Sequence, residues 1–363
     1  MHTLTAEQPR TFRVPKEECF VFTERAAVLF MNHQNDEAPL LGDDEAPRYD
    51  PARDGVLRIV TWNIQFAAGS DCHFFYEGGD LTSVPSERQV FTNLDTLAER
   101  ITALDADVVL LQEVDRGSRR SWYIDEHAEL RQRCPAYKCD ASTWYWKVPW
   151  VPTPLGVRKE QLGRVNLHLS VLSKYLLGDV QRVPLPAIIS DGCLTRFFNL
   201  RRCVQRITLP AADGVDVTIL NTHLSAFTSG DGTSVLQVAV LRDLIASAGP
   251  RWLLAGDFNA LPPGVSAVGL TGQAAIEYPV PDAPSAVAPL FELGTSVIPL
   301  AQLTEPQTRA SHFTLKYHGR ALPEVTIDYI FAAPGWALDT ARVAREVGWP
   351  SDHLPLVASL RPP

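Results

Sequence analysis

Residues 252–264 of the chain read WLLAGDFNALPPG. The apolar, strand-like run stops at Gly256, and Asp257 and Asn259 then stand two positions apart before a proline turn. Because side chains alternate between the two faces of a strand, this spacing predicts that Asp257 and Asn259 share a face and act on one bound group. Asp, Asn, Gly and Pro are also common turn formers, so an ordinary strand end is the alternative interpretation of this stretch alone.

The composition indicates a large folded domain without a basic surface. The 363 residues are 45% hydrophobic, which allows an extensive core, and the net charge is −9. Proteins that hold nucleic acid through a general electrostatic field are usually strongly basic, so a nucleic-acid partner is not favoured. The chain divides into an N-terminal extension, residues 1–56, with a β-hairpin expected within 11–31 and an acidic loop after it, and one domain over residues 57–363.

The first residues, MHTLTAEQPRTF, lack the basic stretch and following apolar stretch of a signal peptide. No apolar run reaches the roughly 20 residues that a membrane-spanning helix needs. We therefore expect a cytoplasmic protein. Its six cysteines include no Cys-x-x-Cys pair, which favours free thiols over a zinc site or disulfides.

Two helices are expected in the domain. Ser86 and Gln89 have the spacing of a capping box ahead of an apolar pattern with helical period, and a second such pattern runs from Thr233 to Gly249. The Pro- and Ala-rich stretch that follows Asn259 is expected to be irregular.

Apolar, strand-like runs end in polar residues throughout the domain. The runs are LRIVTWN (57–63), VVLLQE (108–113), VDVTILNTH (215–223) and WLLAGDFN (252–259), and SDHLPLVASL (351–360) closes the domain. The polar residues at these positions are Asn63, Glu113, His223, Asp257, Asn259, Asp352 and His353. If the strand ends meet at one edge of the fold, they form a metal site with acid–base groups.

Six motifs in this order and spacing resemble those of the endonuclease/exonuclease/phosphatase superfamily, which has the deoxyribonuclease-I-like fold. They are TWNIQ, LQEVD, LNTHL, GDFNALP, TIDYIF and SDHLPLV, and the resemblance covers residues 57–360. It implies a four-layered α/β sandwich of two packed mixed β-sheets flanked by helices. It also implies a metal-dependent phosphoric-ester hydrolase that uses in-line attack of a metal-site water.

The resemblance assigns a metal-binding role to three residues. Glu113 would be the principal ligand, with Asn63 beside it and Asp352 next to the metal. Oxygen ligands of this kind suit Mg²⁺ or Mn²⁺, which keep several of their waters.

The same resemblance assigns catalytic roles to five residues. Asp257 would orient or deprotonate the attacking water, and Asn259 would hold a phosphoryl oxygen. His353, oriented by Asp328, would donate to the phosphoryl oxygen. His223 resembles the second histidine of the family, a candidate general acid for the leaving oxygen.

Several other polar and aromatic residues are open to two interpretations. His168 either lines the pocket or is a structural histidine within a strand. A basic run of four arginines in residues 196–206 either contacts substrate phosphate or, as we favour, lies on a solvated strand face. Aromatic residues in 70–80 and 144–150 form apolar pocket walls or fill core. The basic run consists of Arg196, Arg201, Arg202 and Arg206.

The favoured function is a phosphodiesterase acting on a small phosphorylated metabolite or a lipid head group. The acidic net charge supports it, as does the likeness of NTHLSAFTSGDGT, residues 221–233, to sphingomyelinase-type members. A DNA or RNA nuclease is the first alternative and a phosphomonoesterase the second. A binding scaffold without activity should have lost part of the polar set, which is intact here. The sequence identifies no protein partner.

Overall fold

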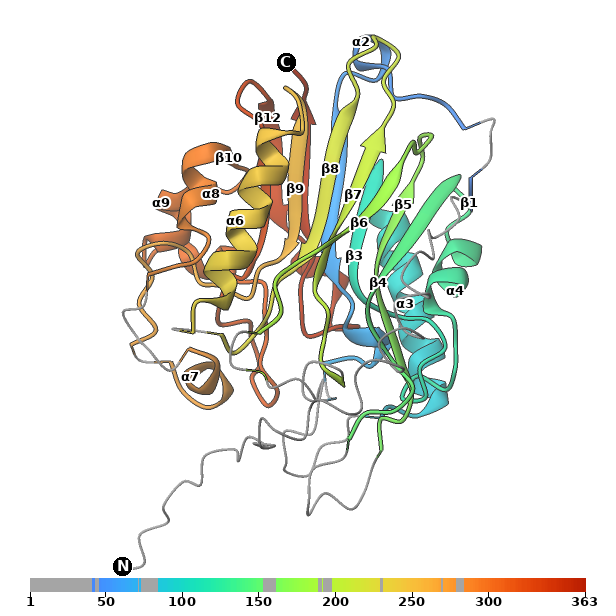
Figure 1. The fold of residues 1–363 in the computed structure, drawn as a ribbon, viewed down its shortest axis with the longest axis vertical. Coiled ribbons are helices and arrows are strands. Elements are labelled where there is room, and N and C mark those ends of the chain that lie inside the picture. Colours follow the sequence, from blue (N-terminus) through green and yellow to red (C-terminus); the bar gives the residue numbers. More distant parts are fainter. Residues whose placement is uncertain are drawn as a thin grey trace, which may run out of the picture.

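The computed structural model describes residues 41–42, 46–70, 72, 84–152, 161–188, 191, 198–228, 231–268, 270–278 and 284–363. The hairpin expected within 11–31 and nearly all of the aromatic stretch 70–80 lie outside these described residues. Two β-sheets occupy the centre of the fold, and helices cover their outer faces (Figure 1).

The first sheet has seven strands, and it is mixed because β2 and β3 are parallel while the other neighbours are antiparallel. Its strands lie in the order β1-β4-β5-β3-β2-β13-β12. Their bounds are β1 Leu41–Gly42, β4 Cys139–Val148, β5 Val165–Ser173, β3 Val108–Asp115, β2 Leu57–Asn63, β13 Leu356–Arg361 and β12 Ala337–Val343. The C-terminal strands β12 and β13 thus return to the sheet in which the domain begins.

The second sheet has six strands and contains the parallel pair β8 and β9. Its strands lie in the order β10-β11-β9-β8-β7-β6. Their bounds are β10 Thr295–Ser296, β11 Asp328–Ala332, β9 Trp252–Asp257, β8 Val217–His223, β7 Cys203–Leu209 and β6 Val180–Pro184. Parallel strands in both sheets place their carboxyl ends at one edge, which positions the polar strand ends together.

Helices form the two outer layers (Figure 1). On the side of the seven-stranded sheet lie α3 (Glu87–Leu104) and α4 (Glu126–Arg133), and on the side of the six-stranded sheet lie α6 (Thr233–Ala246) and α8 (Ala288–Leu293). The side chain of Ser86 accepts from the backbone N–H of Gln89 and the Gln89 side chain returns to Ser86, so the expected capping box is present. The four-layered sandwich predicted from the sequence is confirmed.

The expectation of irregular chain after Asn259 is wrong in part. This stretch contains α8, β10, and the short helices α7 (Gln273–Glu277) and α9 (Leu300–Thr304), with a 3₁₀ turn at Arg309–His312. Elements of five or six residues are too short to show a helical period in the sequence. Short elements α2 (Pro51–Asp54), Gln65–Ala67 and Arg345–Val347 complete the described structure.

The core continues into the segment that we expected to be an extension. Tyr49 is fully buried in the main core and forms a bridge with Ala211 beyond the end of β7. Asp50 caps α2 by accepting from the backbone N–H of Ala52. Tyr49, which lies in the expected extension, therefore packs as part of the sandwich.

The described cysteines are buried free thiols, as expected for Cys72, Cys134, Cys139 and Cys203. Among the described residues, no helix has the length and apolar character needed to cross a membrane.

Candidate active site

The predicted strand ends converge where the two sheets pack together. Strands β2, β8 and β9 end at Asn63, His223 and Asp257, as the sequence indicated. Glu113 differs, because β3 continues to Asp115 and Glu113 lies within the strand. Its backbone has a φ of 58°, and the pairing of β3 with β5 shifts register at this point. This bulge leaves the Glu113 carboxylate within reach of Asn63.

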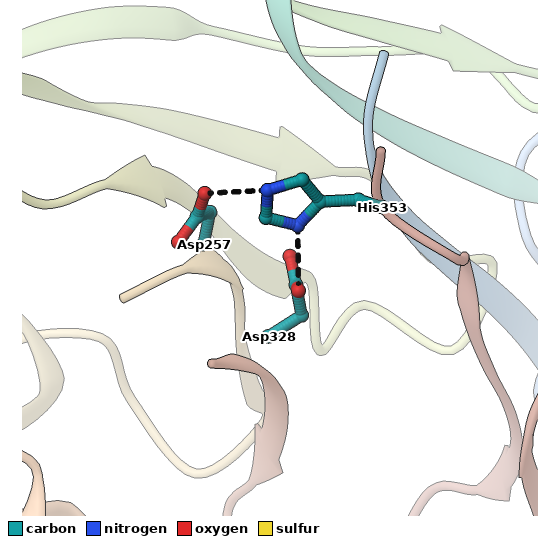
Figure 2. Close-up of side chains that lie close together, drawn as sticks. All are labelled: Asp257, Asp328 and His353. Atoms are coloured by element: carbon teal, nitrogen blue, oxygen red, sulfur yellow. Dashed lines mark hydrogen bonds and ion pairs between the residues drawn. The ribbon is translucent and has the colours of Figure 1, made fainter. Parts of the chain in front are cut away.

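Asp257 and Asp328 face His353 from two neighbouring strands (Figure 2). Asp328 is the first residue of β11 and is the antiparallel pairing partner of Asp257 on β9. The Nδ1 atom of His353 is 2.9 Å from Oδ2 of Asp328, and its Nε2 atom is 3.6 Å from Oδ2 of Asp257. The predicted pairing of His353 with Asp328 is therefore present.

The backbone of the SDH motif is held by the seven-stranded sheet. The Trp62 indole N–H donates to the carbonyl of His353 over 2.9 Å. The Ser351 hydroxyl donates to the carbonyl of Asn63 over 2.7 Å and accepts from the backbone N–H of His353 over 3.1 Å. These bonds fix His353 against β2, so its ring is positioned before any substrate binds.

The charges around His353 favour its protonated imidazole, and the pKa of the neighbouring Asp257 is raised. Burial alone would lower the pKa of His353, but the carboxylates of Asp328 and Asp257 raise it well above its usual range. Burial and the neighbouring charge of Asp328 raise the pKa of Asp257 to about 6. A carboxylate with this pKa is suited to accept a proton near neutral pH.

Glu113 and Asp352 form the acidic part of the site. Burial, together with the charge of Asp352, raises the pKa of Glu113 to about 8, and burial raises the pKa of Asp352. Two desolvated carboxylates that disfavour each other's charge are stabilised by a cation, and hard oxygen ligands suit a divalent one. The donor set at this position therefore fits Mg²⁺ or Mn²⁺.

Asn63 links the acidic part of the site to the catalytic part. Its Nδ2 donates to Oε1 of Glu113 over 3.2 Å and to Oδ2 of Asp257 over 3.0 Å, and its Oδ1 accepts from the backbone N–H of Gln65. In this arrangement Asn63 orients both carboxylates. The role of Asn63 as a metal ligand stays a prediction.

The ligand atoms of Asp257, Asp328 and His353 also lie within 4.8 Å of one another, as in a metal-binding cluster. However, a protonated imidazole has no lone pair for a metal, and His353 is held in that form by two carboxylates. The contacts of these three residues therefore suit acid–base chemistry, and the metal-binding roles of Glu113 and Asp352 stay predictions.

His223 lies on the other side of Asp257 and is buried. Its Nε2 is 3.4 Å from Oδ2 of Asp257, and its Nδ1 is 3.3 Å from the hydroxyl of Tyr145 and 3.9 Å from Oε1 of Glu113. Burial, followed by the charge of Arg202, lowers the pKa of His223 well below its usual range. The neutral imidazole is therefore favoured, which suits a hydrogen-bond donor to the leaving oxygen.

The expectation that Asp257 and Asn259 lie on the same face of one strand is wrong. Strand β9 ends at Asp257, and Asn259 has a φ of 48°, outside the extended region. The two residues are joined by a turn in which the backbone N–H of Asn259 donates to Oδ1 of Asp257 over 2.9 Å. The Asn259 amide donates to the carbonyl of Leu224 over 3.0 Å, so one of its two N–H groups remains for a phosphoryl oxygen.

A family model described as the Endonuclease/Exonuclease/phosphatase family matches residues 60–353. The chain belongs to this family. Its members are phosphoric-ester hydrolases and are generally dependent on a divalent metal. The resemblance noted in the sequence is confirmed at this level. Comparison with curated proteins finds no match.

Solved structures of the Endonuclease/Exonuclease/phosphatase family share the fold. An endonuclease/exonuclease/phosphatase from Beutenbergia cavernae DSM 12333 is 24% identical, with a TM-score of 0.57 over 85% of this chain and 72% of that chain. ANGEL2, described as a 2',3'-cyclic phosphatase, is 16% identical, with a TM-score of 0.52 over 85% of this chain and 96% of that chain.

Three residues that contact the active-site residues were given no such role from the sequence, although one of them, Tyr145, belongs to the aromatic tract 144–150. Gln65 accepts from the backbone N–H of Asp352 over 3.2 Å and donates to the carbonyl of Cys72 over 2.7 Å. Ser351 and Tyr145 are the others, through the contacts given above. The only sequence signal was position, since Gln65 and Ser351 belong to the TWNIQ and SDHLPLV motifs.

The sequence left two interpretations open for His168 and for the aromatic tract 144–150, and the contacts of these residues bear on both. His168 pairs with Oγ of Ser142 over 3.2 Å and with Oδ1 of Asn166 over 3.0 Å, which supports the strand-histidine interpretation. The aromatic tract 144–150 mainly fills core, because Tyr145 and Trp146 are buried in a second hydrophobic cluster that also contains Phe66. For Tyr145 and Trp146 this burial favours the core-filling interpretation, although the Tyr145 hydroxyl also contacts His223.

The arginines of the basic run differ in their exposure to solvent. Arg206 is partly exposed and donates to Gln181, which agrees with a solvated strand face. Arg202 is 7% exposed, so that interpretation is wrong for Arg202. Arg196 lies outside the described residues.

Proposed function

We propose that the protein is a divalent-metal-dependent phosphodiesterase that hydrolyses a small phosphorylated metabolite or a lipid head group. The observation that carries the reaction type is the 3.6 Å contact between Asp257, whose pKa is raised to about 6, and a charged His353. Hydrolysis of a phosphoester needs a base for water and a cationic donor for the phosphoryl oxygens. These two residues supply both at one place.

The chemistry of the step follows from these positions. Asp257 accepts a proton from water as the new oxygen–phosphorus bond forms, and His353 donates a hydrogen bond to a non-bridging phosphoryl oxygen. The bond to the leaving oxygen breaks on the opposite side of phosphorus, as in-line displacement requires. The leaving oxygen accepts a hydrogen bond from neutral His223 and takes its proton from solvent, while Asp257 releases its proton.

The acidic side of the site would hold the metal. Glu113 and Asp352 would bind it, and Asn63 keeps Glu113 in place through the 3.2 Å hydrogen bond. When bound, Mg²⁺ or Mn²⁺ would supply neutralisation of the charge that develops on the phosphoryl oxygens.

The choice of substrate rests on charge. A chain with a net charge of −9 is poorly suited to track a nucleic-acid backbone, which favours a small substrate that meets few side chains. ANGEL2, which shares this fold and is described as a 2',3'-cyclic phosphatase in complex with adenosine-2',3'-vanadate, supports a small substrate. The cytoplasmic location stays a prediction.

The test is a panel of phosphoesters assayed with Mg²⁺, with Mn²⁺ and with excess chelator. The panel contains a generic aryl phosphodiester, glycerophosphodiesters, sphingomyelin, inositol phosphates, nucleotides, RNA and plasmid DNA. We expect turnover of a small diester that the chelator abolishes and either ion restores, with Asp257→Asn as the inactive control. Full turnover in chelator would exclude the proposed mechanism.

A nuclease is the second candidate, and salt separates it from the first. Binding to many phosphates weakens by orders of magnitude between about 50 and 200 mM salt, whereas binding of a small diester changes mildly. Steep salt dependence with efficient plasmid cleavage would favour the nuclease.

Deleting residues 70–80, which follow the strand carrying Asn63, should change which phosphoester is cleaved best.

A further inference from the structure

Arg202 is a buried cation that lacks a counter-ion within the described part of the chain. Its side chain is 7% exposed, and its Nη1 is buried without a hydrogen-bond partner. The guanidinium lies over the ring of Tyr145, with Cζ 5.2 Å from the ring centroid. The neighbouring Arg182 has hydrogen-bond partners in contrast, because it donates to the carbonyls of Trp144 and Arg201.

Arg202 is placed beside the leaving-group side of the active site. Strand β7 begins directly after it, and Val204 of β7 pairs with Thr222, the residue before His223. Tyr145 connects the two groups, since its ring lies under Arg202 and its hydroxyl is 3.3 Å from Nδ1 of His223. The charge of Arg202 also contributes, after burial, to the lowered pKa of His223.

A purely structural role does not account for this arrangement. Removing water from an unpaired guanidinium costs more free energy than one contact with an aromatic face returns. A guanidinium in such a place is matched by a planar or tetrahedral oxyanion, which accepts two parallel hydrogen bonds from it. Tyr145 then serves as the surface that holds the guanidinium in orientation.

We propose that Arg202 binds a second phosphate group of the substrate, carried on the leaving alcohol beyond the ester bond that is cleaved. The proposal rests on the function proposed above, because His223 is there the residue that faces the leaving oxygen. It narrows the substrate class to phosphodiesters whose leaving alcohol is itself phosphorylated.

The test compares two ligands that differ only in this group: glycerophosphoglycerol and its analogue phosphorylated on one glycerol. Binding is measured by calorimetry on the full chain carrying Asp257→Asn, with and without Arg202→Gln. We expect the parent to bind the phosphorylated ligand about tenfold more tightly or better, as for a charge-assisted pair, and Arg202→Gln to abolish this preference. Equal binding of both ligands by the parent, or a preference that survives Arg202→Gln, overturns the proposal.

Two further variants control for charge and folding. Arg206→Gln removes the same charge from a partly exposed position of β7 and should keep the preference. If circular dichroism shows that Arg202→Gln does not fold, Arg202→Lys replaces it, and the preference should fall because an ammonium lacks the planar fork. An unchanged preference in Arg202→Lys overturns the proposal.

Turnover by the wild-type chain separates this inference from the proposed function. If neither glycerophosphodiester nor any other diester of the panel is hydrolysed while the binding preference holds, the proposed function fails and the role of Arg202 stands. If diesters are hydrolysed but the two ligands bind equally, the role of Arg202 fails alone.

Discussion

Asp257 and Asp328 are direct pairing partners on antiparallel strands β9 and β11, and both carboxylates face the ring of His353. Asp328 bonds Nδ1 of the imidazole, and Asp257 approaches Nε2. The sheet pairing thus influences the protonation of Asp257 and His353, because the charge of Asp328, after burial, raises the pKa of Asp257 and both carboxylates raise the pKa of His353.

The contacts among Asp257, Asp328 and His353 predict the order in which their substitutions lower turnover. Asp257→Asn and His353→Ala should each lower kcat by several orders of magnitude, because each removes a group that acts mainly on the transition state. Asp328→Asn should have a smaller effect, since the imidazole is also held by Trp62 and Ser351 through its backbone. Single-turnover kinetics would check the ranking. Retention of more than about a tenth of wild-type activity by His353→Ala would contradict its role.

The pH profile should report Asp257. As the base, Asp257 must be deprotonated, so activity should rise as pH increases through about 6. Asp328→Asn removes the negative neighbour that raises the pKa of Asp257, and the acidic limb of the profile should move to lower pH. Measuring kcat/KM against pH for both proteins at saturating metal tests this. An acidic limb that stays in place would show that Asp328 does not act on Asp257.

Stability without metal should fall as pH rises. In the folded state the pKa of Glu113 is raised to about 8 and that of Asp257 to about 6, so the folded chain binds these protons more tightly than the unfolded chain. The stabilisation is complete at low pH and is lost as pH rises through these two values. Thermal unfolding in chelator should show this decline, and added Mg²⁺ should offset it at alkaline pH. Glu113→Gln should flatten the upper part of the decline.

Gly256 should be irreplaceable for packing. Its φ is 148°, and a Cβ at this position would lie 1.9 Å from the carbonyl oxygen of Thr222 on the neighbouring strand. Gly256→Ala should separate β8 from β9, displace Asp257 and lower both the unfolding free energy and kcat. Gly264→Ala is the matched control, because Gly264 also has a positive φ of 82° but its Cβ would meet only Cγ2 of Thr304, at 4.0 Å, and it should lose only about 1–2 kcal/mol. Equal losses in the two variants would mean that the contact with Thr222 is unimportant.

Breaking the ion pair of Arg120 and Asp115 should be strongly destabilising. Both side chains are fully buried, and Nε of Arg120 is 2.8 Å from Oδ2 of Asp115. Arg120→Met leaves a buried carboxylate unpaired and should lower the unfolding free energy by about 3–5 kcal/mol in urea titration. The exposed pair of Arg361 and Asp339 is the control, and Arg361→Met should cost at most about 1 kcal/mol. A loss below the control value for Arg120→Met would refute this account.

Much of the site could be predicted because its residues occupy the ends of strands, which local patterns reveal. Asn63, His223 and Asp257 lie where the apolar runs indicated. The bulge at Glu113 and the left-handed turn at Asn259 could not be predicted, because both depend on backbone angles that arise from pairing with other segments.

Contacts between segments far apart in sequence were also hidden. Tyr145 reaches His223 from the opposite sheet, and Arg202 is buried over the ring of Tyr145 although its sequence context is that of a charged surface. No local period encodes which strands will face each other, so such residues emerge only when the two sheets are placed together.

The return of the chain to its first sheet has a consequence for biosynthesis. Strand β13 pairs with β2, and His353, just before β13, contacts Trp62 from 291 positions away. A ribosome that has completed β11 has synthesised every strand of the six-stranded sheet but has yet to synthesise His353. On the proposed mechanism, the nascent chain would therefore gain hydrolytic activity only after His353 has been synthesised, and a product terminated before His353 would lack it.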